Sequence, residues 1–300
     1  MVTNTQSFAE LLAPGLLAIY GDEYKQHPEE YSAYLQVENA PKRAYVDTLS
    51  MTGLGLASVK AEGKGIDYDE ALQGYTHRIT YVTYALGFIV TREMYEDDLY
   101  GKIRAFPKFQ ARSLRHTVEI IGANILNRAT TSGYTGADGQ VLASLTHPLI
   151  GGGNFQNRPT NYADLSMTSY QQALMDIAVW VDDKGLYIAA KPKLLVYSAA
   201  GMNDWTAKQL LGSEKDPENS TNAINPAKND VKAKKLHWMT DPDAWDIITD
   251  VPEGLKFHWR RRPEFDKDND PDSENAKFKS TMRCAAFWDD PRGIYHNSGS

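Results

Sequence analysis

The chain has 300 residues, of which 42% are hydrophobic and 24% charged, a balance typical of a soluble protein with one large or two medium domains. Its formal net charge of −7 at pH 7 argues against a protein whose main task is to grip nucleic acid. The single cysteine, Cys284, excludes an intramolecular disulfide framework, and no run approaches the roughly 18 apolar residues of a membrane span.

Residues 1–40 are predicted to form an arm rather than a domain. Apolar residues gather between positions 11 and 20, but Pro14 and Gly15 are expected to interrupt any helix there. The segment is too short for a core of its own. Its apolar patch should therefore pack on a surface elsewhere, on the same chain or on a neighbouring one.

From Tyr45 the pattern changes to period two, which predicts a long two-stranded ribbon from about 46 to 90. The strongest strand covers 75–84, with β-branched and aromatic residues on both faces. Its partner run, 49–60, is diluted by glycine, and 61–67 forms a charged, turn-rich tip. Since such a ribbon is marginal alone in water, it is either an edge hairpin on its own domain or an arm that packs on another subunit.

A long helix is predicted from Pro107 to Arg128, with the proline in its first turn, where the missing N–H costs nothing. Its length would be about 33 Å at 1.5 Å per residue. One apolar stripe follows helical spacing, at Leu114, Val118, Ile121 and Ile125. A long helix with one stripe is expected to lie across a sheet as a scaffold.

The region 160–265 reads as α+β. A helix is expected from Thr168 to about Val181, opened by a capping box of Thr168 and Gln171. A second helix is expected at 205–211 and an acidic loop at 266–275. Four strands are expected at 193–197, 236–239, 245–249 and 255–259. A last strand should cover 277–287, with Cys284 as a small core residue.

Motifs that carry chemistry are missing from the sequence, which contains no G-x-S-x-G, P-loop or H-E-x-x-H pattern. Asp266, Asp268 and Asp270 imitate the start of a calcium loop, but Pro271 and Lys277 occupy positions that need glycine and glutamate. We therefore expect no catalytic residue, no metal site and no cofactor.

Three further polar features have structural interpretations. The pairs 97–98 and 289–290, each of two aspartates, are read as surface pairs or helix-start charges. His147 precedes Pro148 and is read as a turn residue, and the basic runs 232–235 and 260–262 are read as solvated faces.

The order of these elements resembles the major capsid proteins of tailed bacteriophages, most closely the Mu-like major head subunit group. The resemblance covers about residues 40–297, and its order is more specific than any one motif. It is carried by the stretches YALGFIVTRE at 84–93, EDD at 96–98, GADG at 136–139, THP at 146–148, 192–197, NP at 225–226 and RPE at 262–264.

The resemblance implies an α+β tailed-phage capsid fold with four parts. These are an N-terminal arm (1–40), an extended β-hairpin loop (41–90), a peripheral domain with a spine helix (91–160 joined by 266–300) and an axial domain (161–265). The arm, the loop and the two domains are expectations for the structure.

The same resemblance implies a structural, non-enzymatic protein that assembles into hexamers and pentamers of an icosahedral shell around packaged phage DNA. Expected partners are further copies of the chain, a separate scaffolding protein, since the chain has no room for a scaffolding segment of its own, and a portal. Double-stranded DNA should be contacted only weakly and without sequence specificity, and no membrane should be bound. The expected location is the virion capsid, assembled in the host cytoplasm.

The candidate inter-subunit contacts lie on the ribbon: Lys60, Glu62, Lys64, Asp67, Arg78 and Tyr81. Some relatives join subunits through Lys–Asn isopeptide bonds, for which Lys60 or Lys64 with Asn297 would be the candidate pair, although no motif supports the reaction. Two other functions stay open at this point. The chain could form the shell of a cellular compartment that encloses an enzyme cargo, or it could be an enzyme whose site is scattered along the chain.

Overall fold

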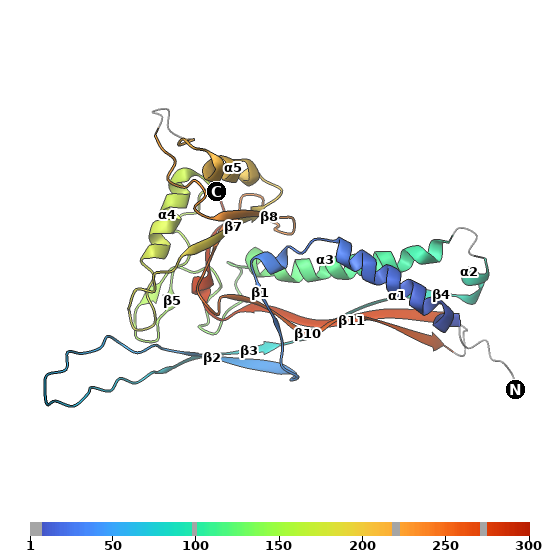
Figure 1. Ribbon diagram of the computed structural model, residues 1–300, viewed down its shortest axis with the longest axis horizontal. Helices are drawn as coiled ribbons and strands as arrows, with labels where there is room; N and C mark the ends of the chain where they lie inside the picture. The colour runs from blue at the N-terminus through green and yellow to red at the C-terminus, as the bar shows by residue number, and fades with distance from the viewer. Residues whose placement is uncertain (1–7, 98–100, 218–222, 271–274) are drawn as a thin grey trace.

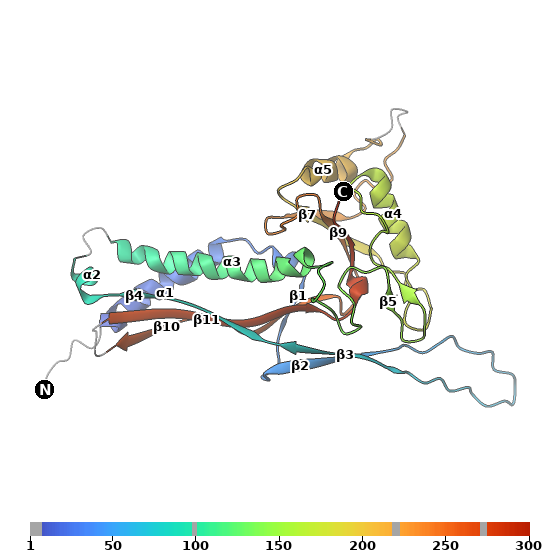
Figure 2. The ribbon, with the colours of Figure 1, turned by 180° about the vertical axis from the view of Figure 1, so that it is seen from behind.

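The computed structural model describes residues 8–97, 101–217, 223–270 and 275–300. The molecule has a long layered part, in which helices lie over a sheet, and a second part that stands across one end of it (Figure 1). A ribbon continues from the sheet of the long part, passes below the second part and extends beyond it (Figure 2). Among the described residues, no helix is long and apolar enough to cross a membrane.

The sheet of the long part has the strand order β1-β10-β11-β4. Its strands are β1 (Gln36–Asn39), β10 (Leu255–Asp270), β11 (Asn275–Trp288) and β4 (Val82–Val90). The β1–β10 pair is parallel and the other two pairs are antiparallel. The expected strand around Phe257 is confirmed, and alternate residues of its start pack in the core.

The predicted acidic loop at 266–275 is wrong for its described residues, because β10 continues to Asp270 and β11 begins at Asn275. Asp266 and Asp268 form ion pairs with Lys279 on β11. On the other face, Phe265 stacks on Phe278. Cross-strand pairing on both faces therefore extends a hairpin through a sequence that looks like a loop.

The spine helix α3 (Ala105–Asn127) confirms the predicted scaffold helix, with Pro107 in its first turn. Leu114, Val118 and Ile125 are buried in the core against the sheet. Shorter helices precede it, α2 (Arg92–Glu96) and η2 (Lys102–Arg104). Of the aspartate pair at 97–98, Asp97 is the C-cap of α2, and Asp98 lies outside the described residues.

The N-terminal segment contains α1 (Phe8–Gln26), which runs through Pro14, so the predicted interruption is wrong. Packing compensates for the backbone hydrogen bond that proline removes. Leu16 and Tyr20 are buried, and the Tyr20 hydroxyl lies 2.9 Å from Ser280 Oγ on β11. Leu16 and Tyr20 of the apolar patch therefore pack on the same chain, while Leu17 is 50% exposed.

The link after α1 is also tied to the spine helix. The buried carboxylate of Glu119 accepts hydrogen bonds from the backbone N–H groups of Glu30 and Tyr31. Burial raises the pKa of Glu119, although these two N–H groups oppose the shift. The short helix η1 (Tyr31–Ala33) follows directly and packs against the middle of α3.

The second part is built on a sheet with the order β12-β9-β7-β8. Its strands are β12 (Ile294–Asn297), β9 (Trp245–Thr249), β7 (Pro192–Ser198) and β8 (Lys232–Leu236). The expected strand at 236–239 is displaced, since the lysine-rich run 232–235 is itself the strand. As an edge strand it can place lysines in solvent while it pairs with β7 on one side only.

Two helices cover one face of this sheet, α4 (Met167–Ala178) and α5 (Asn203–Gly212). The predicted capping box is misplaced by two residues, because Ser166 and Ser169 form it instead of Thr168 and Gln171. A serine hydroxyl at position N3 can serve as the second partner of a cap as well as a glutamine can. The other face of the sheet joins the core of the long part through Val196 and Ile248.

Short elements complete the fold. The two-stranded ladder of β5 (His147–Pro148) and β6 (Asn154–Phe155) lies beside the second part. The 3-10 helix η3 (Pro291–Gly293) is capped by Asp290, whose side chain accepts from the backbone N–H of Arg292. The prediction of a helix-start charge is thus confirmed for Asp290.

Candidate inter-subunit surface

The ribbon is shorter in regular structure than the sequence predicts. Its paired strands are β2 (Tyr45–Met51) and β3 (Gln73–Thr80). β4, which belongs to the predicted ribbon, pairs instead with β11 in the main sheet. The ribbon therefore grows directly out of the edge of that sheet, with Tyr81 as the single residue between β3 and β4.

Cross-strand contacts hold the two ribbon strands together. Arg78 on β3 binds Asp47 on β2 through two hydrogen bonds of 2.7 and 2.9 Å. The Arg78 guanidinium also lies 4.3 Å from the centre of the Tyr45 ring. Because a bidentate, stacked arginine has a defined geometry, these contacts stabilise the register of the ribbon.

Beyond β2 the chain forms an extended loop, residues 52–72, in place of the predicted second strand run to residue 60. The loop is closed at its neck, where Thr52 and Leu72 exchange hydrogen bonds of 2.8 and 3.0 Å. Gly53 and Gly55 follow the neck and weaken strand formation. The loop extends farther from the molecule than any other described segment (Figure 2).

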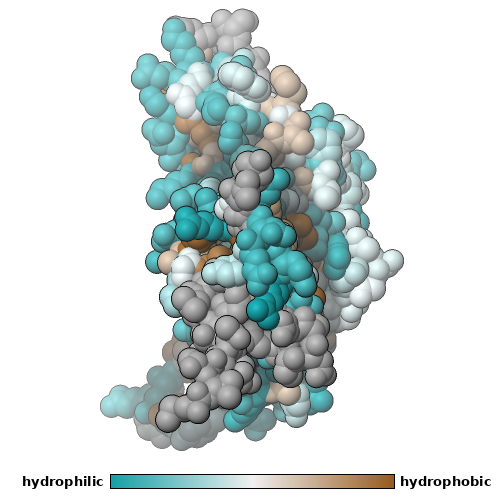
Figure 3. Space-filling view, turned by 90° about the vertical axis from the view of Figure 1, so that its right-hand side faces the viewer, coloured by the Kyte–Doolittle hydropathy of each residue, from teal (hydrophilic) through white to brown (hydrophobic). Residues whose placement is uncertain are grey.

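The loop and its neck expose large apolar side chains. Val59 is 99% exposed and Tyr68 92%. Others also reach solvent: Leu49, Met51, Leu54, Leu56, Ile66 and Leu72. So many exposed large apolar side chains in one segment differ from the singly scattered surface hydrophobics of a soluble protein. A view onto one end of the molecule shows a different surface, with hydrophilic residues spread widely and hydrophobic ones in small recesses (Figure 3).

One carboxylate fixes the loop to the rest of the subunit. Asp69 accepts a hydrogen bond of 2.6 Å from the backbone N–H of Gly55. It also forms an ion pair of 2.9 Å with Lys184 in the second part. These two donors hold the pKa of Asp69 below its ordinary value. Lys184 also donates to the carbonyl of Glu70. The near half of the loop is thereby anchored, while its tip is not part of this contact.

A hollow of about 330 Å³ lies where the ribbon meets the body. Asp289 in its wall accepts from the Thr48 hydroxyl at 2.6 Å and from the Lys256 ammonium at 3.0 Å. Lys256, which is buried, also contacts Glu253. Met51 and Trp288 give the hollow an apolar side. The hollow combines carboxylates with apolar surface, and no group of residues in the described chain has the make-up of a metal site.

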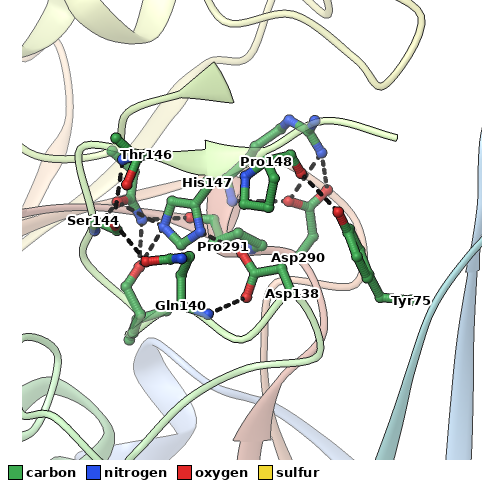
Figure 4. A network of polar contacts seen from close by, with 12 residues as sticks. Tyr75, Asp138, Gln140, Ser144, Thr146, His147, Pro148, Asp290 and Pro291 are labelled. Atoms are coloured by element: carbon green, nitrogen blue, oxygen red, sulfur yellow. Dashed lines mark hydrogen bonds and ion pairs between the residues drawn. The ribbon is translucent and has the colours of Figure 1, made fainter. Parts of the chain in front are cut away.

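A buried polar network beside this hollow centres on His147, and the sequence interpretation of a turn residue missed it (Figure 4). Nδ1 of His147 lies 2.6 Å from Asp138, and Nε2 lies 3.2 Å from both the Leu142 carbonyl and Asn157 Oδ1. Asn157 is fully buried and donates to the carbonyl of Pro291. The network therefore joins the loop after the spine helix to the C-terminal segment.

This network has the geometry of a structural cross-link between chain segments, which we call the His147 brace. Both ring nitrogens of His147 face oxygen atoms of other residues, and its side chain is 1% exposed. Ser144 Oγ contacts Gln140 and the N–H of Thr146. An activated nucleophile would need its hydroxyl against the imidazole. No local sequence pattern predicts this network, because its members lie up to 134 positions apart in the chain.

The predicted contact residues fall into two groups. Lys60, Glu62, Lys64 and Asp67 are exposed on the loop, and Asp67 accepts from the Ser58 hydroxyl at 2.6 Å. Arg78 is exposed but engaged with Asp47, as described above. Tyr81 is only 3% exposed, with its hydroxyl 3.2 Å from His258 Nδ1, so its side chain serves its own subunit.

Asn297, the candidate for an isopeptide bond, lies in a position that does not suit that role. Its side chain is 2% exposed, and its Oδ1 accepts from the N–H groups of Ala163 and Gly299. In this arrangement a lysine from a neighbouring subunit has no open path to the amide carbon.

Comparison with known proteins gives one family. A family model described as phage capsid protein matches residues 74–297. No curated protein sequence matches the chain.

Solved structures share the fold at low sequence identity. A chain of Mycobacterium phage Che8 matches with a TM-score of 0.54 and 11% identity, covering 91% of this chain and 93% of that one. The procapsid of bacteriophage JBD30 matches with 0.53 and 14%, covering 99% and 77%. A virus-like particle from Pyrococcus furiosus matches with 0.51 and 10%, covering 95% and 98%. These likenesses establish the fold.

Proposed function

From the premise that the chain belongs to the family of phage capsid proteins, we propose that its copies close into an icosahedral shell of hexamers and pentamers around packaged phage DNA. Membership of the family gives the general role: the protein is a structural, major capsid protein of a tailed phage, and it is located in the virion capsid. The arrangement of the shell and the contacts within it are the proposal.

The proposed division of labour follows four parts of the chain. The arm (1–40) lies on the spine helix of its own subunit, and the extended loop (41–90) reaches a neighbour. The peripheral domain (91–160 with 266–300) and the axial domain (161–265) build the shell wall. Two features support this division. Among the described residues, α1 and η1 of the arm contact α3 in the same chain, and residues 41–90 hold more exposed large hydrophobic side chains than any of the other three parts.

One observation carries the proposal of an inter-subunit contact, the exposed apolar side chains of residues 49–72. Leaving Val59 and Tyr68 in water is unfavourable by about 25 cal/mol per Å² of apolar surface, so a partner surface is expected. Lys60, Glu62, Lys64, Asp67 and Arg78 would form the polar rim of that contact. Tyr81 is omitted from the rim because it is buried.

The test removes the loop and keeps its neck. Residues 54–70 are replaced by a short Gly-Ser turn, so that Thr52 and Leu72 can still pair. The variant should give a folded subunit, by circular dichroism and urea unfolding, that forms no closed particles in electron microscopy. A milder variant changes Leu56, Val59 and Tyr68 to serine. Normal particles from both variants would rule out the contact.

The proposed partners beyond the chain itself are packaged double-stranded DNA, a separate scaffolding protein and a portal. With a net charge of −7, containment of double-stranded DNA needs no tight contact, so binding of free DNA should be weak, non-specific and steeply salt-dependent. A separate scaffolding protein and a portal would complete assembly in the host cytoplasm. Sequence-specific binding that persists at 0.5 M salt would contradict the weak-contact role.

A second candidate, the shell of a cellular compartment, rests on the likeness to the virus-like particle from Pyrococcus furiosus. Since that likeness concerns the fold alone, the family match favours the phage role. Particles purified from the native source separate the two, because a phage shell encloses DNA and a compartment encloses an enzyme. An enzymatic role for the subunit itself would have to use a residue other than His147, whose side chain is 1% exposed and bonded on both ring nitrogens.

A further inference from the structure

Charged side chains lie directly opposite one another on the less buried face of the hairpin β10–β11. Lys279 lies opposite Asp266 and forms ion pairs with both Asp266 and Asp268. Arg261, by contrast, lies opposite Arg283, which places two cations side by side. Like charges directly opposite each other in neighbouring strands are destabilising. The hairpin therefore pairs opposite charges in one place and opposes like charges in another.

A β-bulge accompanies the arginine pair. The register of β10 against β11 shifts on both sides of Arg261, and Pro263 lies within the second shift. The bulge carries Arg262 to the covered face of the sheet, where its guanidinium lies 5.7 Å from the centre of the buried Trp259 ring. Bulges re-aim side chains and are common beside functional sites. The bulge is a second sign, independent of charge, of a site at this position.

Backbone carbonyls hold the guanidinium of Arg283 in place. Its Nε donates to the carbonyl of Tyr81 at 3.2 Å, and its Nη2 donates to the carbonyl of Ala44 at 3.4 Å. Arg260 Nε donates to the carbonyl of Arg43, the residue before Ala44, at 3.3 Å. The guanidiniums of Arg260 and Arg283 are thereby drawn to consecutive residues of the link between β1 and β2. Carbonyls orient these groups but leave their positive charge unpaired.

Carboxylates of the subunit do little to neutralise this cluster. Among the described residues, its one ion pair joins Arg261 Nε to Glu264 at 3.9 Å, and the Glu264 side chain is 65% exposed. An ion pair of that length in solvent contributes little. Arg43 is also exposed and adds a further positive charge at the same link. The cluster is therefore a place where the subunit concentrates positive charge without balancing it.

We propose that Arg261 and Arg283, with Arg260 beside them, bind an oxyanion of the phosphate class. Guanidinium groups bind phosphate oxygens through paired N–H donors, and a phosphate group carries a charge of about −2 with three strong acceptor oxygens. An ion between the two opposed arginines would turn their repulsion into attraction. A carboxylate has two oxygens and a single charge, so it would leave most of the cluster unbalanced.

Inorganic phosphate and the phosphodiester backbone of nucleic acid share this chemistry, and either could supply the ion. The site goes beyond the proposed shell function, because a single free subunit contains all of the arginines that form it. Binding can therefore be measured on unassembled chains, independently of whether particles form.

Phosphate binding to the unassembled full-length chain tests the site. Equilibrium dialysis against radiolabelled inorganic phosphate, with the ionic strength held constant by NaCl, should show one ion bound per wild-type subunit. Arg261→Gln and Arg283→Gln should each weaken binding by about tenfold or more, because each removes charge-assisted donors. Arg104→Gln is the matched control, since Arg104 is exposed and lies outside the cluster, and it should bind as wild type does.

Stability gives a second readout, in which the sign of the effect is informative. In phosphate-free buffer, Arg261→Gln removes the repulsion with Arg283 and should unfold at the same urea concentration as wild type or at a higher one. Added phosphate should raise the urea midpoint of wild type and leave that of Arg261→Gln unchanged. An arginine with a purely structural role would instead lower the midpoint in both buffers when it is replaced, and that result would contradict the proposal.

Competition distinguishes the sources of the ion. Displacement of labelled phosphate by a short double-stranded DNA would assign the site to phosphodiesters, and failure of the DNA to compete would assign it to the free ion. Succinate that displaces phosphate at equal concentration would overturn the phosphate assignment in favour of carboxylates. Binding of phosphate by Arg261→Gln and Arg283→Gln as tight as that of wild type would overturn the site altogether.

Discussion

The hydroxyl of Thr48 on the ribbon lies 2.6 Å from Oδ1 of Asp289, the residue that follows the last strand of the hairpin β10–β11. The second oxygen of the same carboxylate accepts from buried Lys256. One carboxylate therefore links the base of the ribbon to the sheet of the body. This link is partly buried, so each partner matters more than it would on an open surface.

Replacing Thr48 with valine should loosen the ribbon without unfolding the subunit. The change removes one hydrogen bond, with a net cost of about 1 kcal/mol, and leaves Asp289 with Lys256. Hydrogen exchange of the β2 amides should become faster, while exchange in α3 stays unchanged. Thr48→Ser keeps the hydroxyl and should restore the slower exchange. Unaltered exchange in both variants would show that the contact does not hold the ribbon.

Acid should release the loop from the body. The Gly55 N–H and Lys184 lower the pKa of Asp69, so the ionised carboxylate stabilises the folded loop. This stabilisation is complete above the ordinary aspartate pKa of about 4 and is lost as the pH falls through the lowered value. Exchange of the 55–69 amides, corrected for intrinsic rates, should rise below pH 4.

A pair of variants checks the origin of that acid response. Asp69→Asn removes the charge, so the loop should exchange rapidly at pH 7 and show little further change in acid. Glu62→Gln, on the exposed tip, should keep the wild-type pH response. A loop in Asp69→Asn that still shows the full acid transition would mean that another group governs it.

Truncating the spine stripe should weaken the whole subunit. Leu114 is 3% exposed in the core between α3 and the sheet, and Leu→Ala changes at such sites cost about 2–5 kcal/mol. Urea unfolding of the unassembled subunit should show this loss. Ile120→Ala, at a position 42% exposed on the same helix, serves as the control and should cost far less.

The thiol of Cys284 should be inert in the folded subunit. Cys284 is 1% exposed, and its burial raises the pKa of the thiol to about 12. The reactive thiolate is therefore scarce at pH 8 and shielded from reagents. Iodoacetamide should therefore label the protein only after unfolding in urea, as mass spectrometry can show. Rapid labelling of native subunits would indicate that the β10–β11 hairpin opens locally.

Local periodicity explains what could be read from the sequence. The stripe through Leu114 and Val118 and the alternation around Phe257 each lie within one element, so the helix and the strand were predictable. The path of α1 through Pro14 was not, because Leu16 and Tyr20 are stabilised by partners far along the chain. Local composition favours a loop at 266–270, whereas pairing with β11 makes it a strand.

The candidate surface was predictable in part for the same reason. Charged and turn-forming residues at 61–67 marked an exposed tip, and the glycines at 53 and 55 marked a weak strand. Tyr81 looked like one more ribbon residue, because alternation continues through the whole run. It does not reveal that the strand before Tyr81 pairs with β2 and the strand after it pairs with β11. The His147 brace gave no signal, because Asn157 and Pro291 meet only in the folded chain.

The single residue between β3 and β4 makes the ribbon and the sheet one mechanical unit. Tyr81 is seated against His258, and its carbonyl accepts from Arg283 on β11. A load applied at the loop tip is therefore transmitted along β3 to a fixed pivot and then into the edge of the main sheet. In the proposed contact, tension between neighbouring subunits would be carried by the backbone and by the strand ladder.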